Sequence, residues 1–402
     1  MTDNRESRTA LSPFVLLCIL GGLAIFSTTM SKNPALPLFI RSLGVSRGTV
    51  GFIAAASTVV GILVSLPAGI LSDLYGRRRV LLASAFVFAT APFLYLLVRT
   101  PWQLVAVRVY HGLATAILGP VALAAVADTF EVRRGENMAW YSSATMVGRF
   151  LAPSIGGLLI AGSGGQAASF RWVYLGCGLA GILSLILAIR LPLPERRGVR
   201  GSAPGLQDSW RRLLDETGYV VRHSGIRMIS LVQAAQYFAF GFLEVYLPLR
   251  LADAGWKPAQ IGPLFTVQVL STTLSKPALG RLTDRFGRVA PVAGGLILGA
   301  AGLVAIALSN SYALLALGSG LFGMGLAAVT TAAAALVTDL AHEGSYGAAM
   351  GVLSSIMDVG QSTGPMLGGL AVAAFGYTAA FAGVAVLLTA TAAVFPLVLR
   401  RR

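Results

Sequence analysis

The segment Gly69-Ile-Leu-Ser-Asp-Leu-Tyr-Gly-Arg-Arg78 places two glycines, one aspartate and two arginines between apolar stretches. Adding 211 to each number gives Gly280-Arg-Leu-Thr-Asp-Arg-Phe-Gly-Arg-Val289, which keeps the pattern except for the last arginine. At the same offset Asp128 maps onto Asp339. A repeat of this length indicates that the chain consists of two parallel copies of one unit. The fixed positions of the pattern are Gly69, Asp73, Gly76, Arg77 and Arg78 in the first copy, and Asp284, Gly287 and Arg288 in the second.

The composition around this repeat excludes a water-soluble protein. Of 402 residues, 55% are apolar and 12% are charged, whereas soluble domains carry about 25% charged residues. Apolar stretches long enough to cross a bilayer recur along the chain, so we expect an all-α membrane protein. Twelve spans are predicted, near 13–40, 49–71, 80–98, 102–127, 138–162, 171–192, 225–251, 259–281, 290–309, 312–340, 347–375 and 378–398.

The basic residues predict the orientation of these spans. Twenty-one of them lie in segments on the side of the N-terminus and six on the opposite side. Because Lys and Arg are retained in cytoplasmic connections, we expect both termini in the cytoplasm of a bacterial inner-membrane protein. The longest polar connection, 193–224, separates a six-helix half at 1–192 from a second half at 225–402. An apolar face around Trp210 predicts an interfacial helix within that connection.

Other function classes lack support in the sequence. The net charge of +15 is distributed between apolar segments and not along one face, so nucleic acid is not an expected partner. Cys18 and Cys177 both fall inside predicted spans, which excludes a disulfide framework or a metal cluster. The chain contains no phosphate-binding Gly-x4-Gly-Lys-Ser/Thr loop and no catalytic constellation. We therefore expect neither an enzyme nor a cofactor.

The chain resembles transporters of the major facilitator superfamily over essentially its full length, and among them the 12-span drug:proton antiporters. Its loop at 69–78 matches the family pattern G-x3-D-x2-G-R-[RK], and Arg108-x3-Gly112 resembles a second motif. The antiporter motif G-x3-G-P-x2-G-G occurs twice, with Ala152 replacing one glycine in the first copy. The alternative explanation for this motif is that its small residues only allow helices to pack closely. Its remaining positions are Gly148, Pro153, Gly156, Gly157, Gly360, Gly364, Pro365, Gly368 and Gly369.

The resemblance also implies roles for elements and residues. Spans one, four, seven and ten would line a central cavity, and spans two, five, eight and eleven would form the interface between the halves. On the inner side, Arg77 would pair with Asp128, and Asp73 would face the start of span eleven, so that these residues latch the cytoplasmic end. The general retention of basic residues on the cytoplasmic side is an equally good explanation for Arg77, Arg78 and Arg79.

Six ionisable side chains fall inside the predicted spans: Lys32, Arg108, Arg149, Glu244, Lys276 and Asp358. A lipid-facing charge costs about 3 kcal/mol near the bilayer centre, so we expect these groups to face water or one another. By the resemblance, Lys32, Asn33, Arg108 and Glu244 would lie in the cavity, and Arg149, Lys276 and Asp358 at the interface between the halves. Arg149 and Asp358 are also candidates for the substrate and proton cavity. The repeat offset places Asn33 and Glu244 at equivalent positions of the two halves.

Some of these charges allow two interpretations. Lys276 lies about five residues from the end of its span, and its side chain is expected to extend to the membrane surface. Arg149 and Asp358 fit a structural ion pair as well as a transport role. Tyr110, Tyr237, Phe238 and Phe240 are candidates for stacking on an aromatic substrate, and packing residues otherwise.

These observations predict a monomeric, proton-coupled secondary transporter that exports small amphipathic compounds, with Glu244 as the main proton carrier. Titratable carboxylates within the spans favour protons as the coupling ion. Lys32, Arg108 and Arg149 motivate the first alternative, a proton-coupled carrier of a specific organic anion. A non-transporting membrane sensor built on the same fold is the second alternative.

Overall fold

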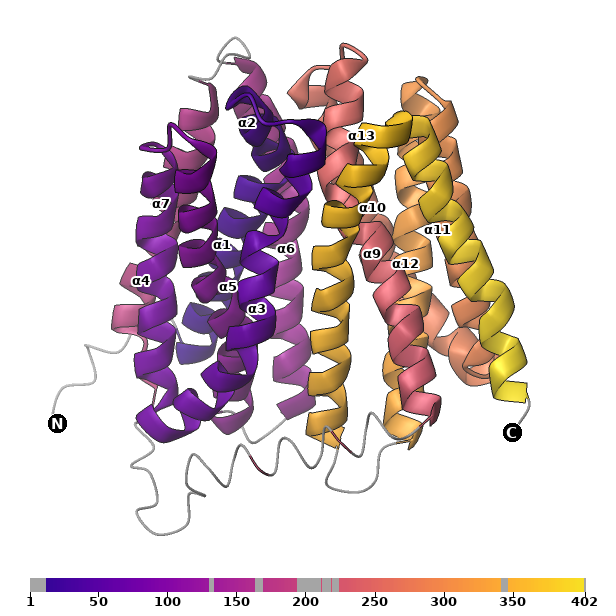
Figure 1. Cartoon of the computed structure of the whole chain (residues 1–402). Coiled ribbons are helices and arrows are strands. Elements are labelled where there is room, and N and C mark those ends of the chain that lie inside the picture. Colours follow the sequence, from indigo (N-terminus) through magenta and orange to yellow (C-terminus); the bar gives the residue numbers. More distant parts are fainter. Residues whose placement is uncertain are drawn as a thin grey trace, which may run out of the picture.

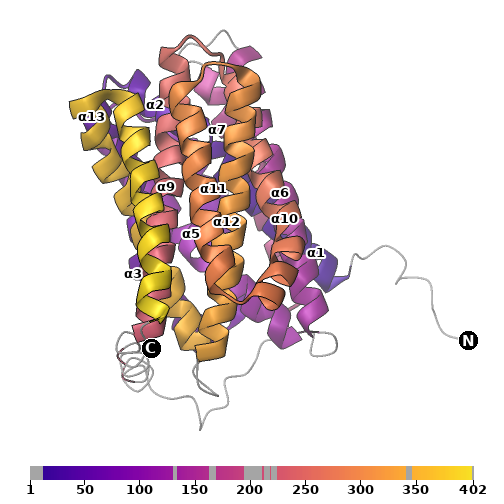
Figure 2. The ribbon, with the colours of Figure 1, turned by 90° about the vertical axis from the view of Figure 1, so that its right-hand side faces the viewer.

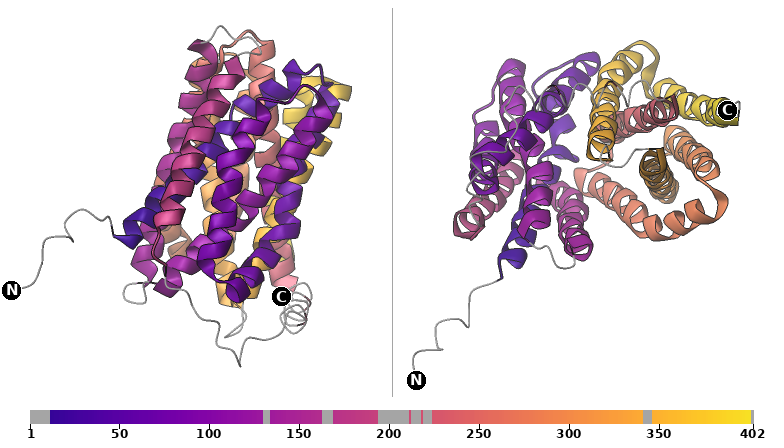
Figure 3. Two further views of the ribbon diagram at one scale, coloured as in Figure 1. Left: turned by 90° about the vertical axis from the view of Figure 1, so that its left-hand side faces the viewer. Right: turned by 90° about the horizontal axis from the view of Figure 1, so that it is seen from below.

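A computed structural model describes residues 12–129, 134–162, 169–193, 224–340 and 346–400, together with positions 211 and 218. All regular structure in these residues is helical. Figures 1 and 3 show α1–α7 gathered on one side of the molecule and α9–α13 on the other. The predicted interfacial helix around Trp210 lies outside the described residues. The helices are α1 (Pro13–Lys32), α2 (Ala35–Ser42), α3 (Arg47–Tyr75), α4 (Arg77–Tyr95), α5 (Pro101–Thr129), α6 (Arg134–Gly162), α7 (Ser169–Arg190), α9 (Ser224–Asp253), α10 (Pro258–Phe286), α11 (Val289–Leu308), α12 (Tyr312–Leu340) and α13 (Tyr346–Arg400).

The all-α membrane fold is confirmed, whereas the count of twelve spans stays a prediction. Within the described residues, ten helical segments have the length and apolar composition that a membrane crossing requires. One of them lies in α13, which folds back on itself at Gly376 (Figure 1). Gly376 has φ 79°, a backbone conformation that glycine adopts without steric cost. Polar residues such as Gln268 and Lys276 make α10 less apolar than its neighbours, although it is 29 residues long.

The first predicted span is interrupted in the structure. We expected one helix over 13–40, but α1 ends at Lys32 and α2 begins at Ala35. Pro34 has no N–H to donate to the preceding turn, so the helical hydrogen-bond ladder cannot continue through it. The interruption leaves Lys32 and Asn33 at a helix end inside the bundle.

The halves meet along two helix pairs, α3 with α13 and α6 with α10. Glycines permit the close approach: a Cβ on Gly51 would overlap the carbonyl of Pro365, and one on Gly157 would overlap that of Pro258. Other motif glycines serve packing within one half, for example Gly148 against Gly22. The antiporter-like motifs therefore occupy tight helix contacts, as small residues in membrane bundles do.

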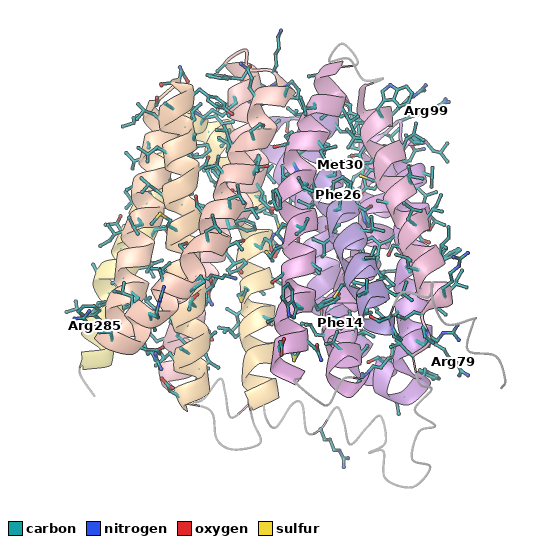
Figure 4. All side chains as sticks on the ribbon, turned by 180° about the vertical axis from the view of Figure 1, so that it is seen from behind. Phe14, Phe26, Met30, Arg79, Arg99 and Arg285 are labelled. Atoms are coloured by element: carbon teal, nitrogen blue, oxygen red, sulfur yellow. The ribbon has the colours of Figure 1, made fainter. Side chains whose placement is uncertain are left out.

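The chain termini and three arginines identify the two ends of the molecule. The start of α1 and the end of α13 lie at the same end of the bundle (Figure 2). Arg79 and Arg285 lie toward that end and Arg99 at the opposite one (Figure 4). Following the predicted orientation, we call the end with the chain termini the inner end and the other the outer end.

Candidate functional site

A cavity of about 550 Å³ lies between the halves. Its size falls within the range of small-molecule binding sites, about 300–1,000 Å³. Helices of both halves form its wall, among them α1, α5 and α6 on one side and α9, α10 and α12 on the other. Charged and amide side chains in the wall are Lys32, Asn33, Arg149, Glu244, Gln268, Lys276 and Gln361, and aromatic ones are Phe88, Tyr237, Phe240 and Phe265.

Glu244 connects the two halves at this cavity. Asn33 Nδ2 donates a hydrogen bond to Glu244 Oε1 at 3.0 Å, and Gln361 Nε2 donates one to Oε2, also at 3.0 Å. Asn33 follows α1 in the first half, whereas Gln361 belongs to α13 in the second. The repeat offset therefore identified two residues in direct contact. Sequence reasoning missed Gln361, which occupies an unspecified position of the Gly360-x3-Gly364 motif.

Arg108 lies behind the wall of the main cavity. Its side chain is 2% exposed, and Nη2 donates to the carbonyl oxygen of Ala54 at 2.7 Å. It borders an adjoining chamber of about 30 Å³ together with Lys32 and Glu244. A chamber of this size has room for a water molecule. Arg108 thus contributes positive charge next to Glu244 from a fixed, buried position.

Lys276 and Arg149 both line the cavity. On α10, Lys276 is an exposed residue that contributes to the cavity wall. Arg149 faces the cavity from α6. Asp358 lies at the α3–α13 contact, where its Oδ2 is 3.8 Å from the position a Cβ on Gly61 would take. The cavity wall, in its described part, does not include Asp358.

The aromatic candidates divide between the cavity and packing. Tyr237 and Phe240 line the cavity. Tyr110 lies within 2.8 Å of Thr90 through their hydroxyl groups, and the backbone of Phe238 packs against Gly364. His111 is buried with Nδ1 3.3 Å from the Tyr95 hydroxyl. These contacts make Tyr110, Phe238 and His111 structural residues in this conformation.

The repeated loop motif forms a charge cluster at the inner end of the second half. Arg288 pairs with Asp284 at 2.6 Å and with Asp339 at 2.9 Å. Hydrogen bonding to Asp339, more than to Asp284, raises the pKa of the Arg288 guanidinium above its ordinary value. The Arg288–Asp339 pair is equivalent, under the repeat, to the expected pair of Arg77 with Asp128.

In the first half, the expected latch lies partly outside the described structure. Gly69 and the side chains of Asp73 and Asp128 are not described, so the Arg77–Asp128 pair stays a prediction. Arg77 Nη1 donates to the hydroxyl of Ser72. Arg78 Nη2 donates to the carbonyl oxygen of Ile189 in α7 at 2.9 Å, which ties α4 to α7.

Among the described side chains, no group of three or more His, Cys, Asp or Glu residues is placed to hold a metal ion.

Comparison with known proteins agrees with this architecture. Multidrug resistance protein 1 of Bacillus subtilis (strain 168) is 23% identical over 343 residues, which cover 84% of each chain. The solved nucleoside transporter NupG superposes with a TM-score of 0.77 at 15% identity, covering 96% of this chain and 99% of that one. The human organic anion transporter MFSD10 (TETRAN) gives a TM-score of 0.69 at 22% identity, covering 95% and 98%.

The family model described as Major Facilitator Superfamily matches residues 17–249 and 229–402. Together these matches cover nearly the whole chain, including both copies of the loop motif. The related proteins are transporters, so this multi-pass membrane protein is a transporter and not an enzyme. The chain belongs to the major facilitator superfamily.

Proposed function

We propose that the chain is a proton-coupled secondary transporter that exports small amphipathic compounds by alternating access. The observation that carries the proposal is Glu244, a titratable group in the cavity wall that hydrogen-bonds to both halves. The mixed aromatic and polar lining suits an amphipathic substrate. The Bacillus subtilis relative, named for multidrug resistance, supports export.

The hydrogen bonds of Glu244 provide a means of coupling. An ionised carboxylate only accepts hydrogen bonds, whereas its protonated form carries one O–H donor. A proton neutralises the carboxylate, and a hydrogen bond to a neutral carboxyl is about half as strong as one to a charged carboxylate, so the contact with Asn33 between the halves weakens. Protonation at Glu244 therefore weakens a link that the ionised form makes, and the halves become freer to reorient.

We assign from the sequence the two halves that move relative to each other during transport. Residues 1–192 and 225–402 act as two halves joined by the connection at 193–224. The excess of Lys and Arg on the side of the N-terminus supports an orientation with both termini in the cytoplasm of a bacterial cell. The protein acts as a monomer in the inner membrane.

Glu244→Gln tests the proposal, because glutamine keeps the size of the side chain and cannot carry a titrating proton. In proteoliposomes, the variant should lose transport driven by a pH gradient and retain exchange of substrate down its own gradient. Glu136→Gln, the same change at an exposed position of α6, is the matched control. Accumulation by Glu244→Gln at the wild-type level would contradict the proposal.

An organic-anion carrier remains the second candidate, and one observation favours it. Lys32, Arg149 and Lys276 line the cavity, whereas Glu244 is the single carboxylate in its described wall. This excess of positive charge suits a negatively charged substrate. The likeness in fold to the human organic anion transporter is compatible with either candidate. A chain that moves neither class of solute would instead be a sensor.

A further inference from the structure

One carboxylate at the outer end joins elements of both halves. Asp253, the last residue of α9, accepts hydrogen bonds at Oδ2 from Arg47 Nη2 at 2.9 Å and from the Tyr377 hydroxyl at 3.0 Å. Its other oxygen, Oδ1, pairs with Arg41 Nη1. Arg41 and Arg47 belong to α2 and α3 of the first half, whereas Tyr377 follows the bend in α13. The Arg47 guanidinium also lies over the Tyr377 ring, 5.2 Å from its centroid.

The Asp253 side chain is less exposed than the two arginines that pair with it. The Asp253 side chain is 17% exposed, against 48% for Arg41 and 57% for Arg47. No other acid can replace it, because Asp253 is the only acidic residue in the outer connections 41–48, 99–101, 163–170, 252–258, 309–311 and 376–377. Charge pairing between the halves at this end therefore depends on a single carboxylate.

The cluster caps a closed outer end. Just below it, the Tyr246 hydroxyl donates to the carbonyl oxygens of Arg47 at 3.3 Å and Pro365 at 3.0 Å. The cavity begins at the level of Asn33 and continues toward the inner end as far as Lys276. The structure is thus closed outside, and outward opening must separate α2 and α3 from α9 and α13. That separation cannot occur without breaking the bonds of Asp253 to both arginines.

We infer that Asp253 is the positioning residue that holds the outer end closed, so that its pairing with Arg41 and Arg47 sets the balance between the two orientations of the halves. The inference rests on the proposed alternating access. Partly exposed ion pairs are individually weak, which suits a closure that must release in every cycle. Tyr377 supports the closure by holding the same carboxylate oxygen from within the second half.

Spin-label distances across the outer end test this inference in the purified full-length chain. Labels at Thr100 and Ser311, which belong to different halves, report its opening in a background with both native cysteines replaced by alanine. Asp253→Asn should increase the outer-open fraction about fivefold, as expected for the loss of partly exposed charge pairing with two arginines. Asp253→Glu keeps the charge and should stay near wild type.

Controls separate this effect from general damage. Lys257→Gln removes an outer charge outside the cluster and should leave the distances unchanged. Simultaneous Arg41→Gln and Arg47→Gln should reproduce the shift from the opposite half, and this tests the inference even if Asp253→Asn does not fold. Unchanged distances in the Asp253→Asn variant, or an equal shift in Lys257→Gln, would overturn the inference.

These distance measurements need neither substrate nor a proton gradient. A chain that shows the shift but moves no solute therefore refutes the proposed transport and not the role of Asp253.

Discussion

Two cations next to Glu244 differ in how firmly the protein fixes them. Arg108 is enclosed and bonded to the Ala54 carbonyl oxygen. Lys32 is at the end of α1, and its amine lies in reach of both the cavity and the adjoining chamber. An arginine presents several donors in a rigid plane, whereas a lysine presents one compact charge on a flexible chain. Arg108 is therefore suited to holding a fixed potential at Glu244, and Lys32 to contacting a mobile substrate.

Arg108→Lys tests whether the shape of the guanidinium matters beyond its charge. The single ammonium group cannot keep the bond to Ala54 and face Glu244 with the same geometry, so proton-driven transport should fall about tenfold or more, the loss expected of one buried charge-assisted hydrogen bond. The measurement is initial rate against external pH in proteoliposomes. Lys32→Arg, the reverse exchange at the cation that lines the cavity, should be tolerated better. If Arg108→Lys transports at the wild-type rate, only the positive charge of Arg108 is needed and the shape of its guanidinium is not.

At the scale of helices, the closed outer end depends on how near α3 and α13 approach. At Gly51 the helices are so close that a methyl group would overlap the carbonyl of Pro365, whereas a Cβ at Gly48 would meet Ala373 at an ordinary 3.5 Å. The two positions are three residues apart on one helix, so they share a face and differ mainly in depth.

Gly51→Ala should therefore force α3 away from α13, while Gly48→Ala should be accommodated. We expect Gly51→Ala to lower the thermal unfolding midpoint and to increase labelling of cysteines placed at the outer end of the cavity. An overpacked contact of this kind typically costs about 1–3 kcal/mol. If Gly51→Ala and Gly48→Ala had the same unfolding midpoint and the same cysteine labelling, α3 and α13 would be farther apart at Gly51 in the membrane than in this structure.

The elements were more predictable from the sequence than the directions of their side chains. Hydropathy located the helices because a bilayer requires long apolar segments, and the repeat brought Asn33 and Glu244 together. Sequence position gave the depth of Lys276 but not the rotation of α10, which decides whether that side chain meets lipid or the cavity. Gln361 gave no signal because an uncharged amide in a span is not conspicuous. The Asp253 cluster depends on three connections meeting at one point, which no local pattern encodes.

For the whole molecule, the charge of the cavity decides how protons and substrate are linked. Its described wall holds three cations, Lys32, Arg149 and Lys276, and one carboxylate, Glu244. A positive substrate near Glu244 favours the ionised carboxylate and so displaces the proton. A negative substrate favours the protonated form. Binding effects of this kind are reciprocal, so protonation weakens binding of a cation and strengthens binding of an anion.

The direction of coupling should consequently follow the charge of the substrate. In wild-type proteoliposomes with an acidic interior and a clamped membrane potential, an aromatic quaternary ammonium should accumulate as protons leave. An aromatic sulfonate of equal size, which remains ionised at every pH used, should accumulate only when the gradient is reversed and protons enter with it. Glu244→Gln should abolish both responses, since each requires the carboxylate to titrate.

Accumulation of the ammonium supports export as the physiological direction, because an inward proton gradient then drives the compound out of the cell. Accumulation of the sulfonate alone would instead identify the chain as an organic-anion carrier, in agreement with the three cations of the cavity wall. If both probes responded to the gradient with the same sign, Glu244 would not be the group through which substrate and proton interact.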